Sequence, residues 1–170
     1  DIETGKISLK PDQLRLMEVV NEVAGIYEPE ALKKGIVLVN QVSADAQVYA
    51  DRDRVSQIIV NLIDNALKYT SRDGEIAFMT LSSDGMPGHV RLQIRDTGHG
   101  IPPADLPRIT ERFYRVDKAR SREEGGTGLG LAIVKHLVHL QGGTIQIESE
   151  FGKGTTVEIA LPTSSTSCAP

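Results

Sequence analysis

The sequence predicts an α+β fold: a two-layer sandwich in which a mixed β-sheet of about five strands carries about three helices on one face. Three segments place apolar residues at helical spacing, and several shorter segments have the apolar character and turn-rich flanks of strands. The strands and helices are grouped along the chain and do not strictly alternate. That grouping favours two layers, with the helices segregated to one side of the sheet.

The composition is typical of a single soluble domain. The chain has 170 residues, of which 39% are hydrophobic and 25% are charged, enough for one core. Its net charge is −4 without a basic run, so nucleic acid is not expected as a partner. No apolar stretch approaches the ~20 residues of a membrane helix, and the start does not resemble a signal peptide, so we expect no membrane contact by this fragment. The single cysteine, Cys168, excludes an internal disulfide and suggests a cytoplasmic location.

The first third of the chain predicts three short strands and one helix. A strand is expected over 7–10. The helix that follows is expected to be interrupted at Pro29 and to end at Gly35 after a short continuation. Further strands are expected over 36–40 and 48–50. The buried face of this helix is predicted to consist of Leu16, Met17, Val20, Val23, Ala24 and Tyr27.

The second predicted helix is the most regular one. Asp51 or Asp53 is expected to cap its start. Its apolar residues keep helical spacing without a break, at Val55, Ile58, Ile59, Leu62, Ile63, Ala66 and Leu67. Two strands are predicted to follow, over 75–82 and 90–95, joined by the turn-rich segment SSDGMPG.

The last third predicts loops, a helix and a hairpin. Residues 96–127 are rich in proline and glycine and are expected to form loops with short helices. A helix is expected from near Gly128 to Leu140. A hairpin over 144–150 and 155–161 then turns at FGKG. The small, polar residues 163–170 are expected to be a disordered tail.

The second helix carries a polar stripe beside its apolar face. At ~100° per residue, Gln57, Asn61, Asn65 and Lys68 fall within a narrow arc. A solvated helix face would account for such a stripe. The stripe would equally suit a nucleotide, because an amide oxygen is a fitting ligand for Mg²⁺ shared with phosphates and a lysine ammonium suits a phosphate oxygen. A phosphate-binding segment elsewhere in the chain is needed to choose between these interpretations.

One candidate segment is RDTGHGIPP, directly after a predicted strand. Gly98 and Gly100 would allow the backbone to adopt positive φ and to approach a planar ligand closely. Asp96 could accept a hydrogen bond from an amino group such as N6 of adenine. Taken alone, the segment also fits an ordinary turn at the end of a strand.

A second candidate is GGTGLG, where Gly126, Gly128 and Gly130 alternate immediately before a helix. Backbone N–H groups at the start of a helix form an anion site, although such a segment also suits a flexible hinge. The third glycine-rich segment, FGKGTT, is most simply a hairpin turn. The spacing matches neither the G-x-x-x-x-G-K-[ST] phosphate loop nor the G-x-G-x-x-G dinucleotide motif.

Five segments, in this order, resemble the N, G1, F, G2 and G3 boxes of bacterial sensor histidine kinases. They are DRDRVSQIIVNLIDNALKYT, IRDTGHGIP, ERFYRVD, GGTGLGLAIVK and FGKGTTVEIALP. More narrowly, they resemble the catalytic ATP-binding domain of the class that pairs with winged-helix response regulators, with features of its phosphate-sensing branch. The resemblance covers about residues 1–162. It implies a Bergerat ATP-binding fold, with a catalytic domain over 9–162 and the end of a dimerisation helix or linker over 1–8.

The resemblance also implies roles for individual residues. Asn65 matches the amide that coordinates Mg²⁺, and Asn61 belongs to the same site. Lys68 matches the lysine that contacts phosphate, and Tyr69 matches a residue that packs on adenine. Arg115 matches an arginine that approaches the γ-phosphate of ATP.

Asp96 matches the aspartate that reads adenine N6, and segment 117–125 corresponds to the mobile ATP lid. The remaining residues implied to bind the nucleotide are Gly98, Gly100, Ile101, Gly126, Thr127, Gly128, Leu129, Gly130 and Thr156.

The chain departs from the family at several positions. Thr110 stands where a Phe is frequent, although Phe113 is present, so the surface expected to dock the partner domain is thinned. His99 stands where a small or apolar residue is common and is expected to be a loop residue facing solvent. His136 and His139 are expected to be ordinary surface or interface residues, without a third ligand for zinc.

None of the four histidines matches the phosphoacceptor motif H-E-L-R-T-P. The chain is therefore expected to be a monomeric fragment that lacks its own target histidine. Its implied partners are the dimerisation and phosphoacceptor helical domain of the same protein and a cognate response regulator.

The residue at position 61 bears on the reaction. Hydrolytic ATPases with the same nucleotide fold carry a Glu at the position of Asn61, where it activates water. An amide cannot act as a general base, a role that contributes ~10²–10⁴-fold in rate, so transfer to an external nucleophile is favoured over hydrolysis. The alternative is a degenerate nucleotide-binding module that regulates by docking alone. Retention of Asn65, Lys68, Asp96 and the loop glycines argues against it.

Overall fold

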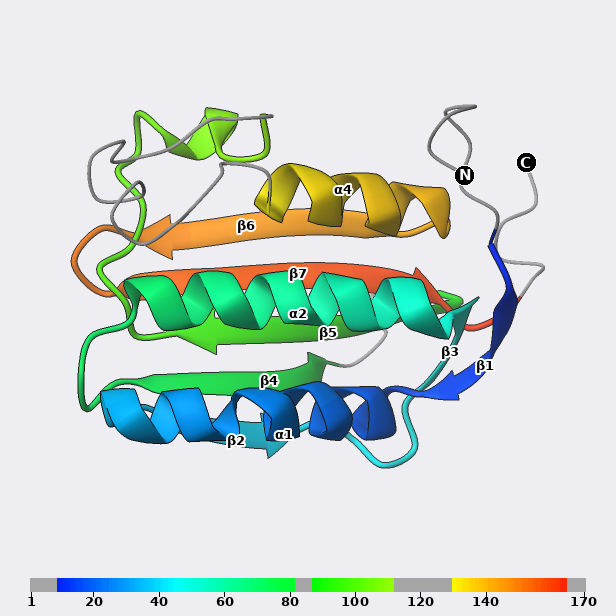
Figure 1. Cartoon of the computed structure of the whole chain (residues 1–170). Coiled ribbons are helices and arrows are strands. Elements are labelled where there is room, and N and C mark those ends of the chain that lie inside the picture. The colour runs from blue at the N-terminus through cyan, green and yellow to red at the C-terminus, as the bar shows by residue number, and fades with distance from the viewer. Residues whose placement is uncertain (1–8, 82–86, 112–129, 165–170) are drawn as a thin grey trace, which may run out of the picture.

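The computed structural model describes residues 9–81, 87–111 and 130–164 (Figure 1). Its elements are β1 (Pro11–Arg15), α1 (Leu16–Lys34), β2 (Val37–Gln41), β3 (Gln47–Asp51), α2 (Arg52–Tyr69), β4 (Glu75–Leu81), β5 (His89–Asp96), the 3₁₀ helix η1 (Leu106–Arg108), α4 (Gly130–Leu140), β6 (Thr144–Glu150) and β7 (Gly154–Pro162). The main sheet has five strands in the order β2-β4-β5-β7-β6. Only the β2–β4 pair is parallel in this sheet, which is therefore mixed.

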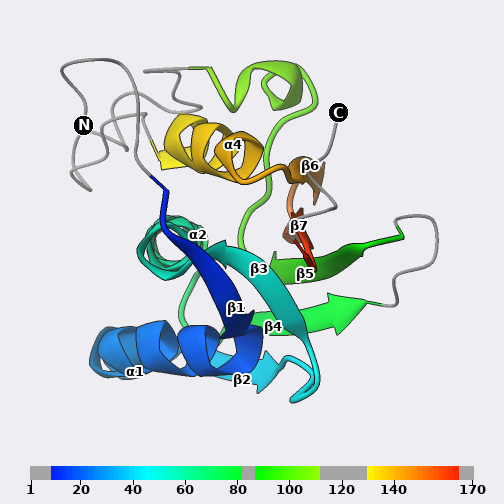
Figure 2. The same ribbon diagram turned by 90° about the vertical axis from the view of Figure 1, so that its right-hand side faces the viewer.

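The predicted two-layer α+β architecture is confirmed. Figures 1 and 2 show α1, α2 and α4 on one face of the five-stranded sheet. The strands β1 and β3 form a separate antiparallel pair beside it. Within the described residues, no helix combines the length and apolar character needed to cross a membrane.

The predicted strand over 7–10 lies partly outside the described residues, and residues 9 and 10 are not in a strand. Residues 1–8 are outside the described ranges, and β1 covers 11–15 instead of the expected 7–10. Its only buried side chain is Leu14, so the sequence gives a weak strand signal there. The strand forms because it pairs with β3 over its whole length.

Helix α1 continues through Pro29, so the prediction of an interruption there is wrong. A proline removes one intrahelical hydrogen bond, the one that the carbonyl of residue i−4 would accept. Here that residue is Gly25, which is exposed, so water can solvate its carbonyl. Beyond Pro29 the helix buries Ala31, and Gly35 ends it in the left-handed conformation, with φ of 69°.

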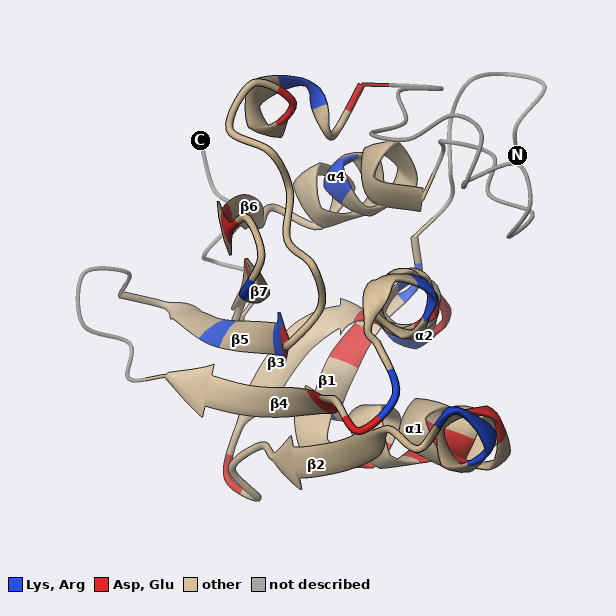
Figure 3. Cartoon of the chain, turned by 90° about the vertical axis from the view of Figure 1, so that its left-hand side faces the viewer, with Lys and Arg blue, Asp and Glu red and all other residues tan. Residues whose placement is uncertain are grey.

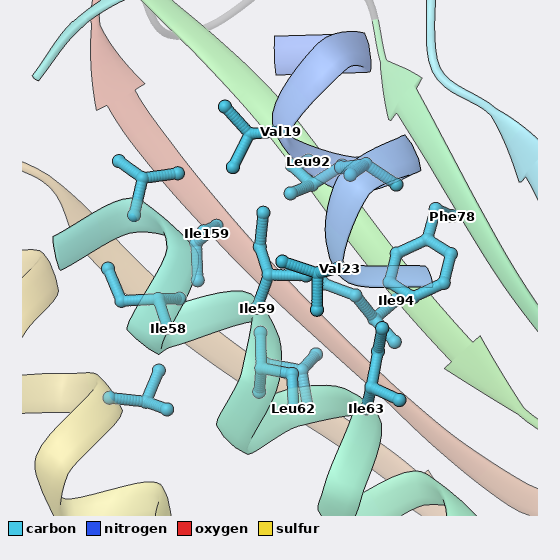
Figure 4. Close-up of a cluster of buried hydrophobic side chains, with 14 of the residues drawn as sticks. Val19, Val23, Ile58, Ile59, Leu62, Ile63, Phe78, Leu92, Ile94 and Ile159 are labelled. Atoms are coloured by element: carbon cyan, nitrogen blue, oxygen red, sulfur yellow. The ribbon is translucent and has the colours of Figure 1, made fainter. Parts of the chain in front are cut away.

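The core lies between the helices and the sheet, and α2 is at its centre (Figure 4). Ile58, Ile59 and Ile63 of α2 are fully buried. Burying an aliphatic side chain of this size contributes roughly 1.5–3 kcal/mol, so this face fixes the rotation of α2 about its axis. Asp51 caps the helix by accepting a hydrogen bond from the Arg54 N–H at 3.2 Å, which confirms one of the two predicted caps. The other core residues labelled in Figure 4 are Val19, Val23, Leu62, Phe78, Leu92, Ile94 and Ile159.

The chain end predicted to be a tail begins with an ordered residue. Thr163 donates hydrogen bonds from its backbone N–H and from its hydroxyl to the carbonyl of Gly88. It also accepts one from the side-chain amide of Gln13. Thr163 therefore belongs to the folded domain, and residues 165–170 lie outside the described ranges.

Candidate functional site

The predicted site residues that the structure describes gather at one end of the sandwich, on the left of Figure 1 and facing the viewer in Figure 3. Four segments meet there: the C-terminal half of α2, the loop after β5, the turn between β6 and β7, and the first turn of α4. Hydrogen bonds and close backbone contacts connect the first three segments. The α4 segment approaches through Gly130, where an added Cβ would lie 3.9 Å from Oδ1 of Asn65.

Asp96 ends β5, opposite Ile76 of β4 and Thr155 of β7. Its Oδ1 accepts hydrogen bonds from the backbone N–H of Gly98 at 2.8 Å and of Thr155 at 3.3 Å. No donor to Oδ2 is present among the described residues. One carboxylate oxygen is thus fixed by the backbone and the other remains an acceptor for a ligand.

Burial has the largest effect on Asp96 and raises the pKa of its carboxyl above the ordinary value. The two backbone hydrogen bonds and the nearby His99 oppose this shift in pKa. A carboxyl that is partly withdrawn from water forms stronger hydrogen bonds to a donor than an exposed one. These features suit recognition of an amino group.

The glycines around Asp96 allow close backbone approach. A Cβ on Gly98 would lie 2.5 Å from the carbonyl oxygen of Tyr69, and one on Gly100 would lie 2.4 Å from that of Glu150. Gly100 has φ of 76°, as predicted, whereas Gly98 is not in the positive-φ region, so that part of the prediction is wrong. Gly98 is needed for the contact with α2, because any side chain would push the loop away from the helix.

Tyr69 is the last residue of α2, and it contacts the loop through both its backbone and its ring. Its carbonyl accepts a hydrogen bond from the His99 N–H at 3.3 Å. The two rings meet edge to face, with centroids 5.4 Å apart and planes at 85°. The Nε2 atom of His99 is buried, so the expectation that His99 faces solvent is wrong.

Ser149 of the β6–β7 hairpin connects the hairpin to Ile101 of the loop, and it also contacts Thr155. The Ile101 N–H donates to the Ser149 hydroxyl at 2.7 Å, and that hydroxyl lies 2.9 Å from the hydroxyl of Thr155.

The structure does not bring Thr156 to this cluster. In the strand register Thr156 is opposite Arg95, one residue away from the pair formed by Thr155 and Asp96. Side chains alternate between faces, so Thr156 lies on the sheet face away from the helices.

The polar stripe of α2 contributes Asn61, Asn65 and Lys68, all half-buried. The Nδ2 atom of Asn61 is buried and has no hydrogen-bond partner within the described part of the chain, which is the situation that a ligand oxygen would relieve. Lys68 forms an ion pair with Asp64, one helical turn earlier, at 3.1 Å. The sequence interpretation missed Asp64, although its i,i+4 spacing from Lys68 could have indicated the pair.

Several predicted site residues lie outside the described residues. They are Arg115, Gly126, Thr127, Gly128 and Leu129, together with Phe113 and the segment 117–125. Gly130, the last glycine of the alternating series, is the first residue of α4. His136 and His139 are exposed on that helix, as expected.

The donor set fits a magnesium ion shared with phosphates. The described residues contain no cluster of three or more His, Cys, Asp or Glu side chains that would form a metal site by itself. Mg²⁺ usually takes one or two protein ligands and completes its shell with water and substrate phosphates. The amide oxygens of Asn61 and Asn65 are the groups that would supply the protein ligands.

Comparison with known proteins identifies the family and agrees with the fold. The family model for histidine kinase-, DNA gyrase B-, and HSP90-like ATPases matches residues 50–165. The chain is 36% identical over 171 residues to the autoinducer 2 sensor kinase/phosphatase LuxQ of Vibrio vulnificus, covering 98% of this chain and 20% of LuxQ. It therefore spans about a fifth of that relative's length.

Two solved structures are similar in fold. The nucleotide-free catalytic domain of histidine kinase ThkA has a TM-score of 0.80 at 26% identity, covering 94% of this chain and 99% of that chain. Full-length ShkA in complex with AMPPNP has a TM-score of 0.79 at 32% identity, covering 93% of this chain and 32% of that chain. The chain belongs to the histidine kinase-, DNA gyrase B-, and HSP90-like ATPase family, as an ATP-binding domain of the sensor histidine kinase type.

Proposed function

We propose that this domain binds Mg-ATP at the end of the sandwich formed by α2, the loop after β5 and α4. It positions the γ-phosphoryl group for transfer to a histidine on a separate helical domain of the same protein. That helical domain then passes the phosphoryl group to a response regulator. We place this reaction in the cytoplasm and expect the isolated domain to be a monomer.

The observation that carries the proposal is the arrangement of Asp96. Its Oδ1 is held by two backbone N–H groups, and its Oδ2 has no donor among the described residues. The carboxylate is therefore oriented before any ligand arrives, as base recognition requires. Tyr69 lies beside it, at the point where Gly98 brings the loop against the end of α2. An adenine ring would donate its amino group to Asp96 and pack on Tyr69.

On α2, the polar side chains that precede Tyr69 are suited to bind magnesium and phosphate. Asn65 and Asn61 would hold the magnesium ion, and Lys68 would contact a phosphate oxygen. Bound Mg²⁺ would neutralise charge that develops on the transferring phosphoryl group. The chain's own contribution is positioning and electrostatic complementarity, which account for most of the catalysis of phosphoryl transfer.

The identity of residue 61 favours transfer over hydrolysis. An amide cannot remove a proton from water, so Asn61 cannot serve as a general base. The nearest carboxylate on the same helix, Asp64, is engaged with Lys68. The relative ShkA was solved in complex with AMPPNP, which supports nucleotide binding by a domain with this fold.

Asp96→Asn tests the base-binding assignment. Asn retains Oδ1 for the N–H groups of Gly98 and Thr155, so the loop should keep its structure, while the free carboxylate oxygen becomes an amide N–H₂. We expect ATP affinity to fall about 10- to 100-fold, because a donor then faces the adenine amino group. GTP affinity should fall less, and calorimetric titration of both nucleotides measures the difference.

The same variant tests the proposed reaction. With the histidine domain supplied in trans, the natural chain should form acid-labile phosphate on that domain, and Asp96→Asn should lose most of this activity. Asp45→Asn, in the exposed turn before β3, is the matched control and should behave as the natural chain. Equal losses for ATP and GTP would remove Asp96 from base recognition. Rapid hydrolysis of ATP without transfer would contradict the proposed reaction.

A further inference from the structure

His99 is held in place by contacts on both sides of its backbone. Its N–H donates to the carbonyl of Tyr69 at 3.3 Å, and its own carbonyl accepts from the N–H of Gly152 at 2.6 Å. The first contact joins the loop to the end of α2, and the second joins it to the turn between β6 and β7. The imidazole therefore projects from a fixed point, unlike a side chain on a free loop tip.

The orientation of the ring defines the chemistry of its two nitrogens. Nδ1 lies 3.2 Å from the carbonyl oxygen of Gly100. A carbonyl oxygen can only accept, so Nδ1 carries the hydrogen in this contact. In the neutral imidazole, Nε2 is then a lone-pair acceptor.

This acceptor is buried and unsatisfied. Nε2 has no hydrogen-bond partner within the described residues, while the ring edge packs against Tyr69. Leaving a buried acceptor unpaired costs about 1–3 kcal/mol, so an apolar side chain would serve the fold better at this position. The ring packs edge to face against Tyr69, and His99 belongs to the loop that carries Asp96 into the site, so a ligand bound there is a source for the missing donor.

We propose that Nε2 of His99 is a second acceptor, beside Asp96, for the amino group of the bound purine. The imidazole thereby selects amino-bearing over oxo-bearing bases and holds Tyr69 against the base. This role rests on the proposed nucleotide site and adds to it a residue that determines specificity. His99 belongs to the loop that follows Asp96, three residues further along the chain, so both acceptors lie at the same end of the site.

His99→Leu tests the proposal, because leucine has a similar volume but no lone pair. We expect affinity for ADP to fall about five- to tenfold, the usual effect of losing one hydrogen bond. Affinity for inosine diphosphate, whose base carries an oxygen in place of the amino group, should stay unchanged. The melting temperature should stay the same or rise, since the variant removes a buried unpaired acceptor. His139→Leu, on the exposed face of α4, is the control and should change neither affinity.

A measurement on the natural chain provides an independent test. The ¹⁵N chemical shift of the His99 Nε2 should move on titration with ADP and stay in place with inosine diphosphate. Equal losses of both nucleotides in His99→Leu, or an Nε2 resonance that ignores ADP, would overturn the assignment of His99. Failure of the natural chain to bind ADP at all would instead overturn the proposed nucleotide site.

Discussion

The proposed base end and the proposed phosphate end of the site are built in different ways. At the base end, the loop 97–101 is fixed by hydrogen bonds to α2 and to the β6–β7 hairpin. Asp96 there is oriented by two backbone donors. The phosphate end consists of the side chains Asn61, Asn65 and Lys68 on one helix. At that end, one amide N–H₂ is buried without a partner in the described part of the chain, and the ammonium is paired with Asp64.

This difference assigns different tasks to the two ends. A preformed site binds without the entropic cost of ordering its own groups, so the base end should set nucleotide affinity and base selection. The phosphate end has fewer fixed contacts, and under the proposed function its amides and lysine would gain their partners from magnesium and phosphate. It should therefore set the dependence of affinity on Mg²⁺ and on the number of phosphates.

Gly98→Ala should produce the largest effect, because it breaks the contact that organises the base end. The new Cβ would lie 2.5 Å from the backbone oxygen of Tyr69, so the loop must move away from α2. Forced overpacking of this kind costs about 1–3 kcal/mol. We expect the free energy of unfolding, measured by denaturant titration, to fall by that amount. The affinity for ADP, measured by calorimetry, should fall about 10- to 100-fold.

Gly25→Ala is the matched control for this substitution. Nothing lies within 4 Å of a Cβ built on Gly25, which is exposed in the middle of α1. Alanine should stabilise that helix by roughly 0.5–1 kcal/mol and leave ADP affinity unchanged. If Gly98→Ala retained natural ADP affinity, the fixed position of the loop at Gly98 would not determine nucleotide binding.

Asn65→Ala should affect the phosphate end alone. Removing the amide oxygen should abolish the increase in ADP affinity that Mg²⁺ produces. We expect a loss of about tenfold with Mg²⁺ present, equivalent to about 1.4 kcal/mol, and little change in its absence. Gln57→Ala, two turns earlier on the same polar stripe, should keep the natural magnesium dependence. Magnesium dependence that survives in Asn65→Ala would move the metal to other ligands.

Patterns within one helix or one loop made much of this site predictable from sequence. The spacing of Asn61, Asn65 and Lys68 relative to the apolar face places them together on α2, and the structure does so. The sequence DTGHG after a strand likewise predicted the positive φ of Gly100. Each of these features depends on residues near one another in the chain.

The features that sequence reasoning missed depend on distant segments. Choosing between Thr155 and Thr156 requires the register of β7 against β5, and a shift of one residue moves a side chain to the other face. The burial of His99 depends on Tyr69 and on Gly152, which is more than fifty residues away. The continuity of α1 past Pro29 depends on burial of Ala31 in the core. The local spacing of residues does not predict any of these long-range contacts.

Asp64→Asn should produce the smallest effect, and it acts at the proposed phosphate end. The ion pair between Lys68 and Asp64 is partly exposed, and i,i+4 pairs of this kind contribute only about 0.3–0.5 kcal/mol. A phosphate group can therefore recruit Lys68 at little cost. Releasing the lysine should raise Mg-ATP affinity about twofold and leave AMP affinity unchanged, since AMP lacks the outer phosphates.

Glu22→Gln, which breaks the exposed pair with Arg52 at the other end of α2, should change neither affinity. The gain should shrink as salt rises, because ions screen the interaction of Lys68 with phosphate. A fall in Mg-ATP affinity would instead make Asp64 part of the nucleotide site, as a carboxylate that helps to hold magnesium.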